Sequence, residues 1–428
     1  MKTSMLALLI FLFFSCHESD NLTEGIGSGN SPLKAYSNEV ILDWNKTALK
    51  IMSGPEYNPL IASRVQAMVH IAMHDALNNI SGVYETYALN AEDKAAHPVA
   101  AAASAVHTVL VVTFPGKKAT LDSALHVSLA KIATGDARES GIKLGLKAGN
   151  AILSQQPNDA IFQNPIGEIP PSTVPGVYQG VPPTPFVYAP FWASMQTFSL
   201  KNASEFRVAA QPALTSEEYA KDFNEVKNKG AKNGSSRTEE ETAIAKYWYE
   251  LSEIGWNRVT QIAVNGKKTD LLTTARLFAL VNMALADSYT AGWDSKDHYN
   301  FWRPYTGIRM ANIDGNESTL PDANWESFLD TPPVQDYPST HSVLGNAAAT
   351  VLAALLGDNT TFTMTSPSAD PAQATRTFTS FSTAAAENAE SRVLAGLHFR
   401  FSCKSGLELG KKIGECTVNN YLRPVNDI

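Results

Sequence analysis

Apolar residues recur every three or four positions through most of this 428-residue chain, and this helical periodicity limits the folds open to it. After the start signal Asn58-Pro59, one predicted helix carries a single apolar stripe: Ile61, Val65, Met68, Val69, Ala72, Ala76 and Ile80. Similar patterns predict further helices at 98–114, 119–133, 137–153, 216–229, 239–263, 270–293, 342–356 and 382–398. Alternating patterns typical of strands are nearly absent. The sequence therefore predicts an all-α fold, a helical bundle.

The segment 165–212 is the long exception to this pattern. It holds nine of the 23 prolines, and proline fixes φ and removes a backbone donor, so the segment cannot be a continuous helix. We expect an extended arm that wraps the bundle. The aromatic rings expected to pack on the bundle surface are Phe186, Tyr188, Phe191, Trp192 and Phe198.

Gly406, Gly410 and Gly414 are spaced by four residues near the C-terminus. On a helix, this spacing places all three on one face. Because that face has no side chains, we expect a second helix to approach it closely.

The composition is that of a large globular domain. Hydrophobic residues make up 44% of the chain and charged residues 18%, and no low-complexity linker interrupts the chain after its N-terminal part. We therefore expect a single domain over 37–428. The net charge of −8 argues against nucleic-acid binding as a main role, because such binding needs a basic field.

The N-terminal part looks like an export signal followed by a tether. Residues 1–15 hold Lys2 and an apolar run that is too short for a membrane-spanning helix. The residues before Cys16 resemble a bacterial lipobox, in which the cysteine is lipidated, and residues 16–36 read as a flexible polar tether. We expect an exported lipoprotein, anchored to a membrane such as the outer membrane only through Cys16, facing the periplasm or the cell surface.

Three short segments in the last third of the chain carry most of the chemistry. The first is Lys296, six intervening residues and Arg303-Pro304. The second is Pro338-Ser339-Thr340-His341, and the third is Ser391-Arg392 with His398 after five intervening residues. Together they supply three cations, a helix start and two imidazoles, which suit a tetrahedral or trigonal-bipyramidal oxyanion. The sequence predicts a phosphate or vanadate site.

The second segment reads as the start of a helix. Ser339 is a good N-cap, and an apolar run begins at Ser342. The first amides of a helix lack intrahelical partners, so those near Thr340 and His341 can point at an anion. His341 stands in the first turn, where an imidazole with a pKa of about 6.5 suits proton exchange with a bound oxyanion.

We expect the third segment to be helical as far as His398. Ser391 and His398 then share a helix face, whereas Arg392 must reach around the helix. A guanidinium can do so and bind two oxygens at once. His398 would approach the central atom from the side opposite His341, as an axial ligand or a nucleophile.

These segments resemble a superfamily that joins type 2 phosphatidic acid phosphatases, class A bacterial acid phosphatases and vanadium-dependent haloperoxidases. The family pattern is Lys-x6-Arg-Pro, then Pro-Ser-Gly-His, then Ser-Arg-x5-His-x3-Asp. Its first part is complete at 296–304, and its third part runs from Ser391 to His398. The resemblance is strongest over 270–428, the part expected to bear the site. The Arg237-Thr238 helix start looks like soluble haloperoxidase-type members.

The resemblance implies a vanadate cofactor and a role for each matching residue. The residues implied to bind the vanadate oxygens are Lys296, Arg303, Ser339, Thr340 and Arg392. His398 would bond vanadium as the axial ligand, and His341 would be the acid–base residue. Hydrogen peroxide would lose a proton to His341 and be polarised by Lys296. The halide, iodide or bromide, would then leave as hypohalous acid.

Three positions depart from the family pattern. Thr340 stands where Gly is usual, so a side chain lies near the oxyanion. Ser402 stands where Asp is frequent, so we expect His398 to be less strongly oriented and less basic, which weakens a phosphohistidine mechanism most. Val334 stands where an aromatic residue or His often lies near the halide, so the halide stays open.

Two other functions fit the same residues. In a periplasmic acid phosphatase without a cofactor, His398 would attack the phosphorus of a phosphate ester and His341 would protonate the leaving alcohol. In a non-catalytic, oxyanion-binding lipoprotein, Thr340 and Ser402 would mark lost catalysis. The sequence favours the haloperoxidase, and it leaves open whether the chain forms a homo-oligomer.

Overall fold

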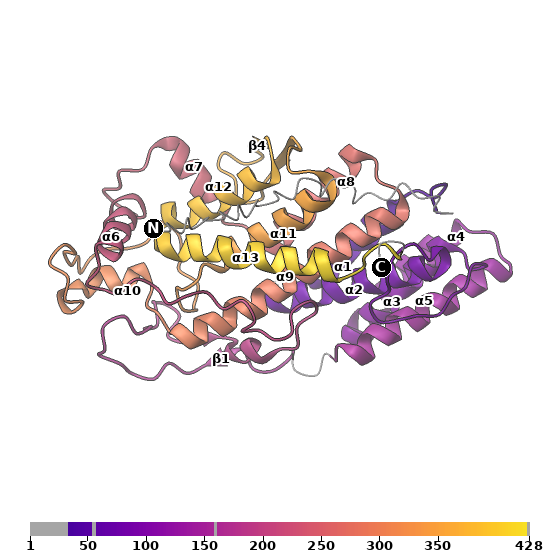
Figure 1. Cartoon of the computed structure of the whole chain (residues 1–428), viewed down its shortest axis with the longest axis horizontal. Coiled ribbons are helices and arrows are strands. Elements are labelled where there is room, and N and C mark those ends of the chain that lie inside the picture. The colour runs from indigo at the N-terminus through magenta and orange to yellow at the C-terminus, as the bar shows by residue number, and fades with distance from the viewer. Residues whose placement is uncertain (1–32, 54–56, 158–160, 426–428) are drawn as a thin grey trace, which may run out of the picture.

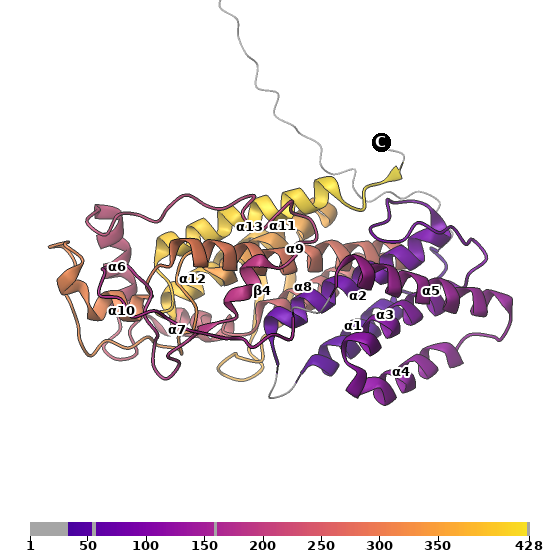
Figure 2. The ribbon, with the colours of Figure 1, turned by 90° about the horizontal axis from the view of Figure 1, so that it is seen from below.

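The computed structural model of the chain is an elongated helical bundle (Figures 1 and 2). It describes residues 33–53, 57–157 and 161–425. The predicted signal peptide, Cys16 and most of the predicted tether lie outside these residues. Within them the all-α prediction is confirmed, since the strands form only two short antiparallel pairs. No described helix combines the length and apolar character needed to cross a membrane.

The described α-helices are α1 (Glu39–Met52), α2 (Pro59–Ser81), α3 (Pro98–Thr113), α4 (Lys118–Ala130), α5 (Asp136–Gln155), α6 (Glu217–Lys229), α7 (Glu239–Tyr247), α8 (Ser252–Lys267), α9 (Leu271–Tyr299), α10 (Pro304–Arg309), α11 (Thr340–Leu356), α12 (Phe381–Leu394) and α13 (Arg400–Asn420). The 3-10 helices are η1 (Pro115–Lys117), η2 (Pro190–Ser194) and η3 (Ala311–Ile313). The strand pairs are β1 (Ile166–Gly167) with β2 (Val187–Tyr188), and β3 (Phe362–Thr365) with β4 (Thr375–Phe378).

The long helix α9 lies at the centre of the bundle. Helices α1 to α5 pack at one end of the molecule, and α6, α7 and α10 lie at the other (Figure 1). Every residue of α9 from Leu271 to Trp293 is buried, as expected of a helix that is surrounded on all sides. The last turn of α9 carries Lys296, so the packing of this helix places a cation in the interior of the protein.

Helix starts follow the local signals in the sequence. The Asn58 side chain accepts hydrogen bonds from the amides of Leu60 and Ile61, with Pro59 in the first turn, so the predicted start of α2 is confirmed. Asp270 caps α9 in the same way through Leu272 and Thr273. These caps fix where the two central helices begin.

The predicted helix over 239–263 is wrong as one element, because the chain breaks between Tyr247 and Ser252. The break leaves backbone carbonyls without helical partners. Two of them are used at the site: Trp248 O accepts from Arg392, and Glu250 O lies 3.2 Å from His341 Nε2. The interruption therefore supplies acceptors to the candidate site.

The predicted helix over 382–398 also ends earlier than expected. Helix α12 stops at Leu394, and Gly396 follows with a left-handed φ of 78°. The Gly396 amide donates to Val393 O at 2.9 Å and the Leu397 amide to Arg392 O at 3.0 Å, which is a Schellman cap. His398 therefore lies in the turn before α13 and not on the helix face of Ser391, correcting the prediction that the two share that face.

The close helix approach predicted from the three glycines is confirmed. A Cβ added at Gly406 would lie 2.5 Å from the backbone oxygen of Ser339, and one at Gly410 would clash with Val343 O. Helix α13 therefore packs its glycine face directly on the backbone of α11. This contact holds the start of α11 beside the turn that carries His398.

The proline-rich segment wraps the bundle, and its aromatic rings reach deeper than the surface. Trp192 and Phe198 are only 1% and 3% exposed, so they belong to the core. The Tyr178 amide donates to Asn300 O at 2.8 Å, and the Tyr188 amide donates to Pro333 O at 2.7 Å. These bonds attach the arm to the connections on either side of α10.

Candidate active site

A cavity of about 420 Å³ brings six of the seven predicted anion-site residues together. They come from the end of α9, the start of α10, the start of α11, the end of α12 and the following turn. The six residues are Lys296, Arg303, Thr340, His341, Arg392 and His398. Ser339 is fully buried and is not among the lining residues, and its hydroxyl accepts from Ser342 at 3.1 Å.

Two of the three cations are fixed by the loop between Pro332 and Pro338, which we call the 332–338 loop. Lys296 Nζ donates to the backbone oxygens of Gln335 and Asp336, the latter at 3.0 Å. Arg303 Nε donates to Val334 O at 2.7 Å, and its Nη1 donates to Leu397 O at 2.9 Å. The loop thus sets the positions of both cations.

Arg392 and Thr340 keep hydrogen-bonding capacity that the described residues leave unused. The guanidinium of Arg392 is 1% exposed, its bond to Trp248 O is long at 3.4 Å, and its Nε has no partner among the described residues. The buried Thr340 hydroxyl likewise has no partner within the described part of the chain. An unpaired buried donor costs free energy, so a ligand that accepts hydrogen bonds is favoured here.

Burial lowers the pKa of all three cations in the cavity. Burial lowers the pKa of Arg392 to about 10, and burial followed by repulsion from Arg303 lowers the pKa of Lys296 well below its ordinary value. Burial also lowers the pKa of Arg303. Each cation is therefore less stable in its charged form than in water, and a bound anion would offset that cost.

The two imidazoles are held in different ways. His341 Nε2 lies 3.2 Å from Glu250 O, and because a carbonyl only accepts, Nε2 carries the hydrogen. His398 Nε2 lies 2.9 Å from Arg303 Nη1. Burial is the main cause that lowers the pKa of both rings well below the ordinary value, with Arg392 next for His341 and Arg303 next for His398.

Asp336 is a site residue that the sequence analysis missed. It lies in the 332–338 loop, is fully buried, and places Oδ1 2.9 Å from His398 Nδ1. This contact has ion-pair distance without hydrogen-bond alignment. Its Oδ2 accepts a hydrogen bond from Ser402. A carboxylate thus reaches the His398 ring from the loop, beside Ser402, although position 402 itself carries none. That His398 is less strongly oriented and less basic than in the family stays a prediction. The loop offers no periodic pattern that could have revealed it.

The remaining wall of the cavity is aromatic and apolar. Its lining residues are Tyr57, Pro59, Phe186, Tyr188, Leu251, Tyr289, Trp293, Pro332, Pro333 and Val334. Behind this wall, the buried Glu253 accepts from the hydroxyls of Tyr57 at 2.5 Å and Tyr289 at 2.8 Å. Burial raises the pKa of Glu253 to about 7. One part of the cavity wall is therefore cationic, and the rest is aromatic and apolar.

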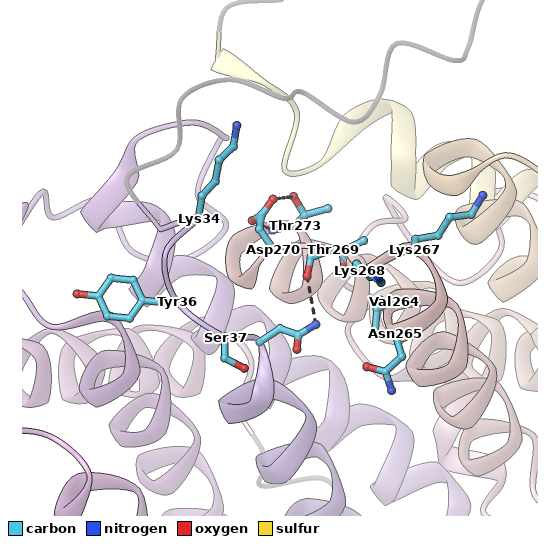
Figure 3. Close-up of a pocket in the computed structure, with 11 residues that line it drawn as sticks. Lys34, Tyr36, Ser37, Val264, Asn265, Lys267, Lys268, Thr269, Asp270 and Thr273 are labelled. Atoms are coloured by element: carbon cyan, nitrogen blue, oxygen red, sulfur yellow. Dashed lines mark hydrogen bonds between the residues drawn. The ribbon is translucent and has the colours of Figure 1, made fainter.

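A second, more open cavity of about 690 Å³ lies where α8 ends and α9 begins (Figure 3). Its lysines do not converge: Lys34 and Lys267 lie apart at its two ends, and the Asp270 carboxylate is bonded to Thr273 (Figure 3). No histidine is among the described residues that line it. Although it is larger, its chemistry does not match the predicted oxyanion site.

Comparison with known proteins points to one group. The sequence model of the VCPO second helical-bundle domain matches residues 276–427, which include all the predicted anion-site residues. The vanadium chloroperoxidase of Curvularia inaequalis is 25% identical over 397 residues, covering 73% of this chain and 64% of that protein. The predicted resemblance to the vanadium-dependent haloperoxidases is confirmed. The chain spans less than two thirds of the length of that chloroperoxidase.

Solved structures show that the haloperoxidase fold extends over nearly the whole chain. The crystal structure described as the first bacterial vanadium-dependent iodoperoxidase superposes with a TM-score of 0.78 at 24% identity, covering 91% of this chain and 98% of that one. The apo form of a bacterial vanadium-dependent chloroperoxidase superposes with a TM-score of 0.67 at 16% identity, covering 86% and 94%. The helical bundle of this chain is therefore the helical haloperoxidase fold.

Proposed function

We propose that this chain is a vanadate-dependent haloperoxidase that oxidises iodide or bromide with hydrogen peroxide. The observation that carries the proposal is the convergence of Lys296, Arg303, Arg392 and two imidazoles on one cavity, in a chain similar to vanadium haloperoxidases. Similarity to an iodoperoxidase structure supports iodide as the first halide to test.

The residues present fit vanadate. Three buried cations line the cavity, and the Asp336 carboxylate lies 3.9 Å from one of them, Arg303, so an oxyanion would balance the excess positive charge. The unpaired Arg392 Nε and Thr340 hydroxyl can donate to its oxygens, as can the first amides of α11. Ser339 was predicted to bind a vanadate oxygen, and this stays a prediction that its position at the start of α11 supports. His398 Nε2 is the nitrogen suited to bond vanadium.

The acid–base work falls to His341. Because its Nε2 hydrogen is directed to Glu250 O, a neutral His341 has its lone pair on Nδ1, which would take a proton from hydrogen peroxide and later return it. Lys296, held by the 332–338 loop, would polarise the bound peroxide. Bound vanadate would supply Lewis-acid activation of the peroxide without a change of oxidation state.

The test is to load the purified protein with vanadate and to assay peroxide-dependent iodide and bromide oxidation. Halogenation that appears only after loading supports the proposal. His398→Ala should abolish it, whereas His107→Ala, a matched change of a histidine that pairs with Asp122 on α3 and α4, should not. Vanadate binding without any turnover would instead support the non-catalytic oxyanion-binding alternative.

Acid phosphatase is the second candidate, and one observation favours it. A phosphohistidine nucleophile needs activation, and the Asp336 carboxylate 2.9 Å from His398 Nδ1 can supply it. In that case the protein would hydrolyse a phosphate ester without a cofactor, and vanadate would inhibit it. Measuring ester hydrolysis with and without vanadate separates the two functions.

Export and lipid anchoring through Cys16 are also proposals, supported by the lipobox-like sequence. Residues 1–15 and Cys16 lie outside the described part of the chain. If the proposal holds, Cys16→Ser moves the protein from the membrane fraction to the soluble fraction and removes labelling by a radioactive fatty acid. Unchanged fractionation and labelling would contradict it.

A further inference from the structure

We propose that Asp336 is a positioning residue for His398, whose carboxylate favours the imidazole tautomer with the hydrogen on Nδ1 and the lone pair on Nε2. The proposal rests on the proposed function, because it explains how this chain prepares His398 to bond an oxyanion centre. Nothing in the three sequence motifs assigns a role to this loop residue.

The contacts of the His398 ring determine its tautomer. Arg303 Nη1 lies 2.9 Å from Nε2 and 3.5 Å from Nδ1, and because a guanidinium can only donate hydrogen bonds, we assign the nearer nitrogen, Nε2, as the acceptor. The hydrogen of the neutral ring is then on Nδ1, the atom that lies 2.9 Å from Asp336 Oδ1. In this tautomer the Nε2 lone pair faces Arg303, and the Nδ1 hydrogen lies on the side of Asp336 Oδ1, at ion-pair distance without full hydrogen-bond alignment.

Asp336 is itself held from several sides, as a residue that orients another must be. Its amide donates to Phe301 O at 3.0 Å, and its carbonyl accepts from Lys296 Nζ at 3.0 Å. Its Oδ2 accepts from the Ser402 hydroxyl. Among the described residues Oδ1 has no aligned hydrogen-bond partner, and it lies 2.9 Å from His398 Nδ1 and 3.9 Å from Arg303 Nη1.

The position of Ser402 makes a sharp test possible. Because the Ser402 hydroxyl touches Asp336 Oδ2, a carboxylate at position 402 can occupy nearly the same space. Asp336 could otherwise serve only to balance the charges of Lys296 and Arg303, or to shape the loop. Moving the carboxylate from the loop to α13 separates these roles, since only a positioning role is restored by the exchange.

The experiment compares three variants of the full chain with the wild type. Asp336→Ser should lower vanadate affinity and iodide turnover by about 10- to 100-fold, the usual effect of removing a group that orients a ligand. The exchange Asp336→Ser with Ser402→Asp should recover most of that loss. Ser402→Ala keeps Asp336 but removes one of the bonds that hold it, so it should lose less activity than Asp336→Ser. A folded exchange variant as inactive as Asp336→Ser, or full activity of Asp336→Ser, would overturn the proposal.

A second measurement does not depend on turnover. With the histidines labelled with 15N and His398 assigned through His398→Gln, the ring nitrogens of the wild type should show a protonated Nδ1 and an unprotonated Nε2. In Asp336→Asn the two tautomers should become mixed. If the wild type already has Nε2 protonated, the proposal fails. If the tautomer is as expected while halogenation and ester hydrolysis are both absent, the positioning role stands and the proposed function fails.

Discussion

His341 Nε2 lies 3.2 Å from the backbone oxygen of Glu250, so the first turn of α11 is tied to the break between α7 and α8. The contact fixes which ring nitrogen is protonated, and it leaves Nδ1 as the basic atom. The break between α7 and α8 thus determines which ring nitrogen of the proposed acid–base residue can accept a proton.

The separation of proton transfer from anion binding can be tested at His341. His341→Gln keeps a donor for Glu250 O but cannot carry a proton. We expect turnover to fall by about 10²- to 10⁴-fold, as for loss of a general acid–base group, with vanadate affinity changed by less than about tenfold. Steady-state kinetics and a vanadate titration measure the two quantities. Equal losses in both would show that His341 binds the anion instead.

Arg392 should contribute to vanadate binding through the several donors of its planar guanidinium as well as through its charge. Arg392→Lys keeps one positive charge but removes the donors on Nε and one terminal nitrogen, so we expect vanadate to bind about 10- to 100-fold more weakly. The matched control is Arg207→Lys, at a guanidinium paired with Asp294 away from the cavity. A titration followed by 51V NMR gives the affinities. Equal affinity of Arg392→Lys and the wild type would contradict bidentate binding.

The buried Glu253 predicts a specific dependence of stability on pH. Its pKa rises in the folded state from an ordinary 4.5 to about 7, with burial as the main cause and the nearby Glu250 also raising it. The folded chain therefore holds this proton more tightly than the unfolded chain. The free energy of unfolding should fall between pH 4.5 and 7 by about 3 kcal/mol relative to a side chain that does not titrate.

Glu253→Gln provides that reference: its amide oxygen can accept from one of Tyr57 and Tyr289, and its amide nitrogen can donate to the hydroxyl of the other. Urea unfolding at pH 5 and pH 7.5 should show the stability of the Gln variant rising relative to the wild type. The difference should be near its full value above pH 7 and nearly absent below pH 4.5. A constant difference across this range would mean that Glu253 does not titrate between the two states.

The contact between α11 and α13 leaves no space for a side chain at the glycines of α13, so adding a methyl group there should destabilise the fold. Gly410→Ala places a methyl group against Val343 O, so we expect a loss of about 1–3 kcal/mol in the free energy of unfolding. The control is Gly266→Ala on α8, where nothing lies within 4 Å, and where alanine should stabilise the helix by up to about 1 kcal/mol. Urea unfolding measures both. Similar stability of the two variants would contradict backbone-to-backbone packing at Gly410.

Sequence reasoning predicted most of the long helices because their signals are local. An apolar stripe, an N-cap such as Asn58 and a glycine face each depend on neighbouring residues only. Helix α1 and the β3–β4 pair were not predicted. The ends of α7 and α12 were misplaced, because tertiary contacts and the cap at Gly396 stop helices whose apolar pattern continues.

The site was predicted to the extent that it consists of sequence motifs. Six predicted anion-site residues meet in one cavity, although their roles there stay predictions. Asp336 could not be predicted, because its function depends on a spatial contact with His398, from which it is separated by a helix, a strand pair and another helix. The place of Phe186 and Tyr188 in the cavity wall could not be predicted either, because both belong to a segment without periodicity.

The arm that carries Phe186 and Tyr188 belongs to no bundle helix, whereas the cations are fixed by helix ends and the 332–338 loop. The arm is nevertheless bonded to that loop through the Tyr188 amide and Pro333 O. Changes of the Phe186 or Tyr188 side chain would alter the apolar wall and leave this backbone bond in place, so the wall can vary while the loop that fixes the cations is kept.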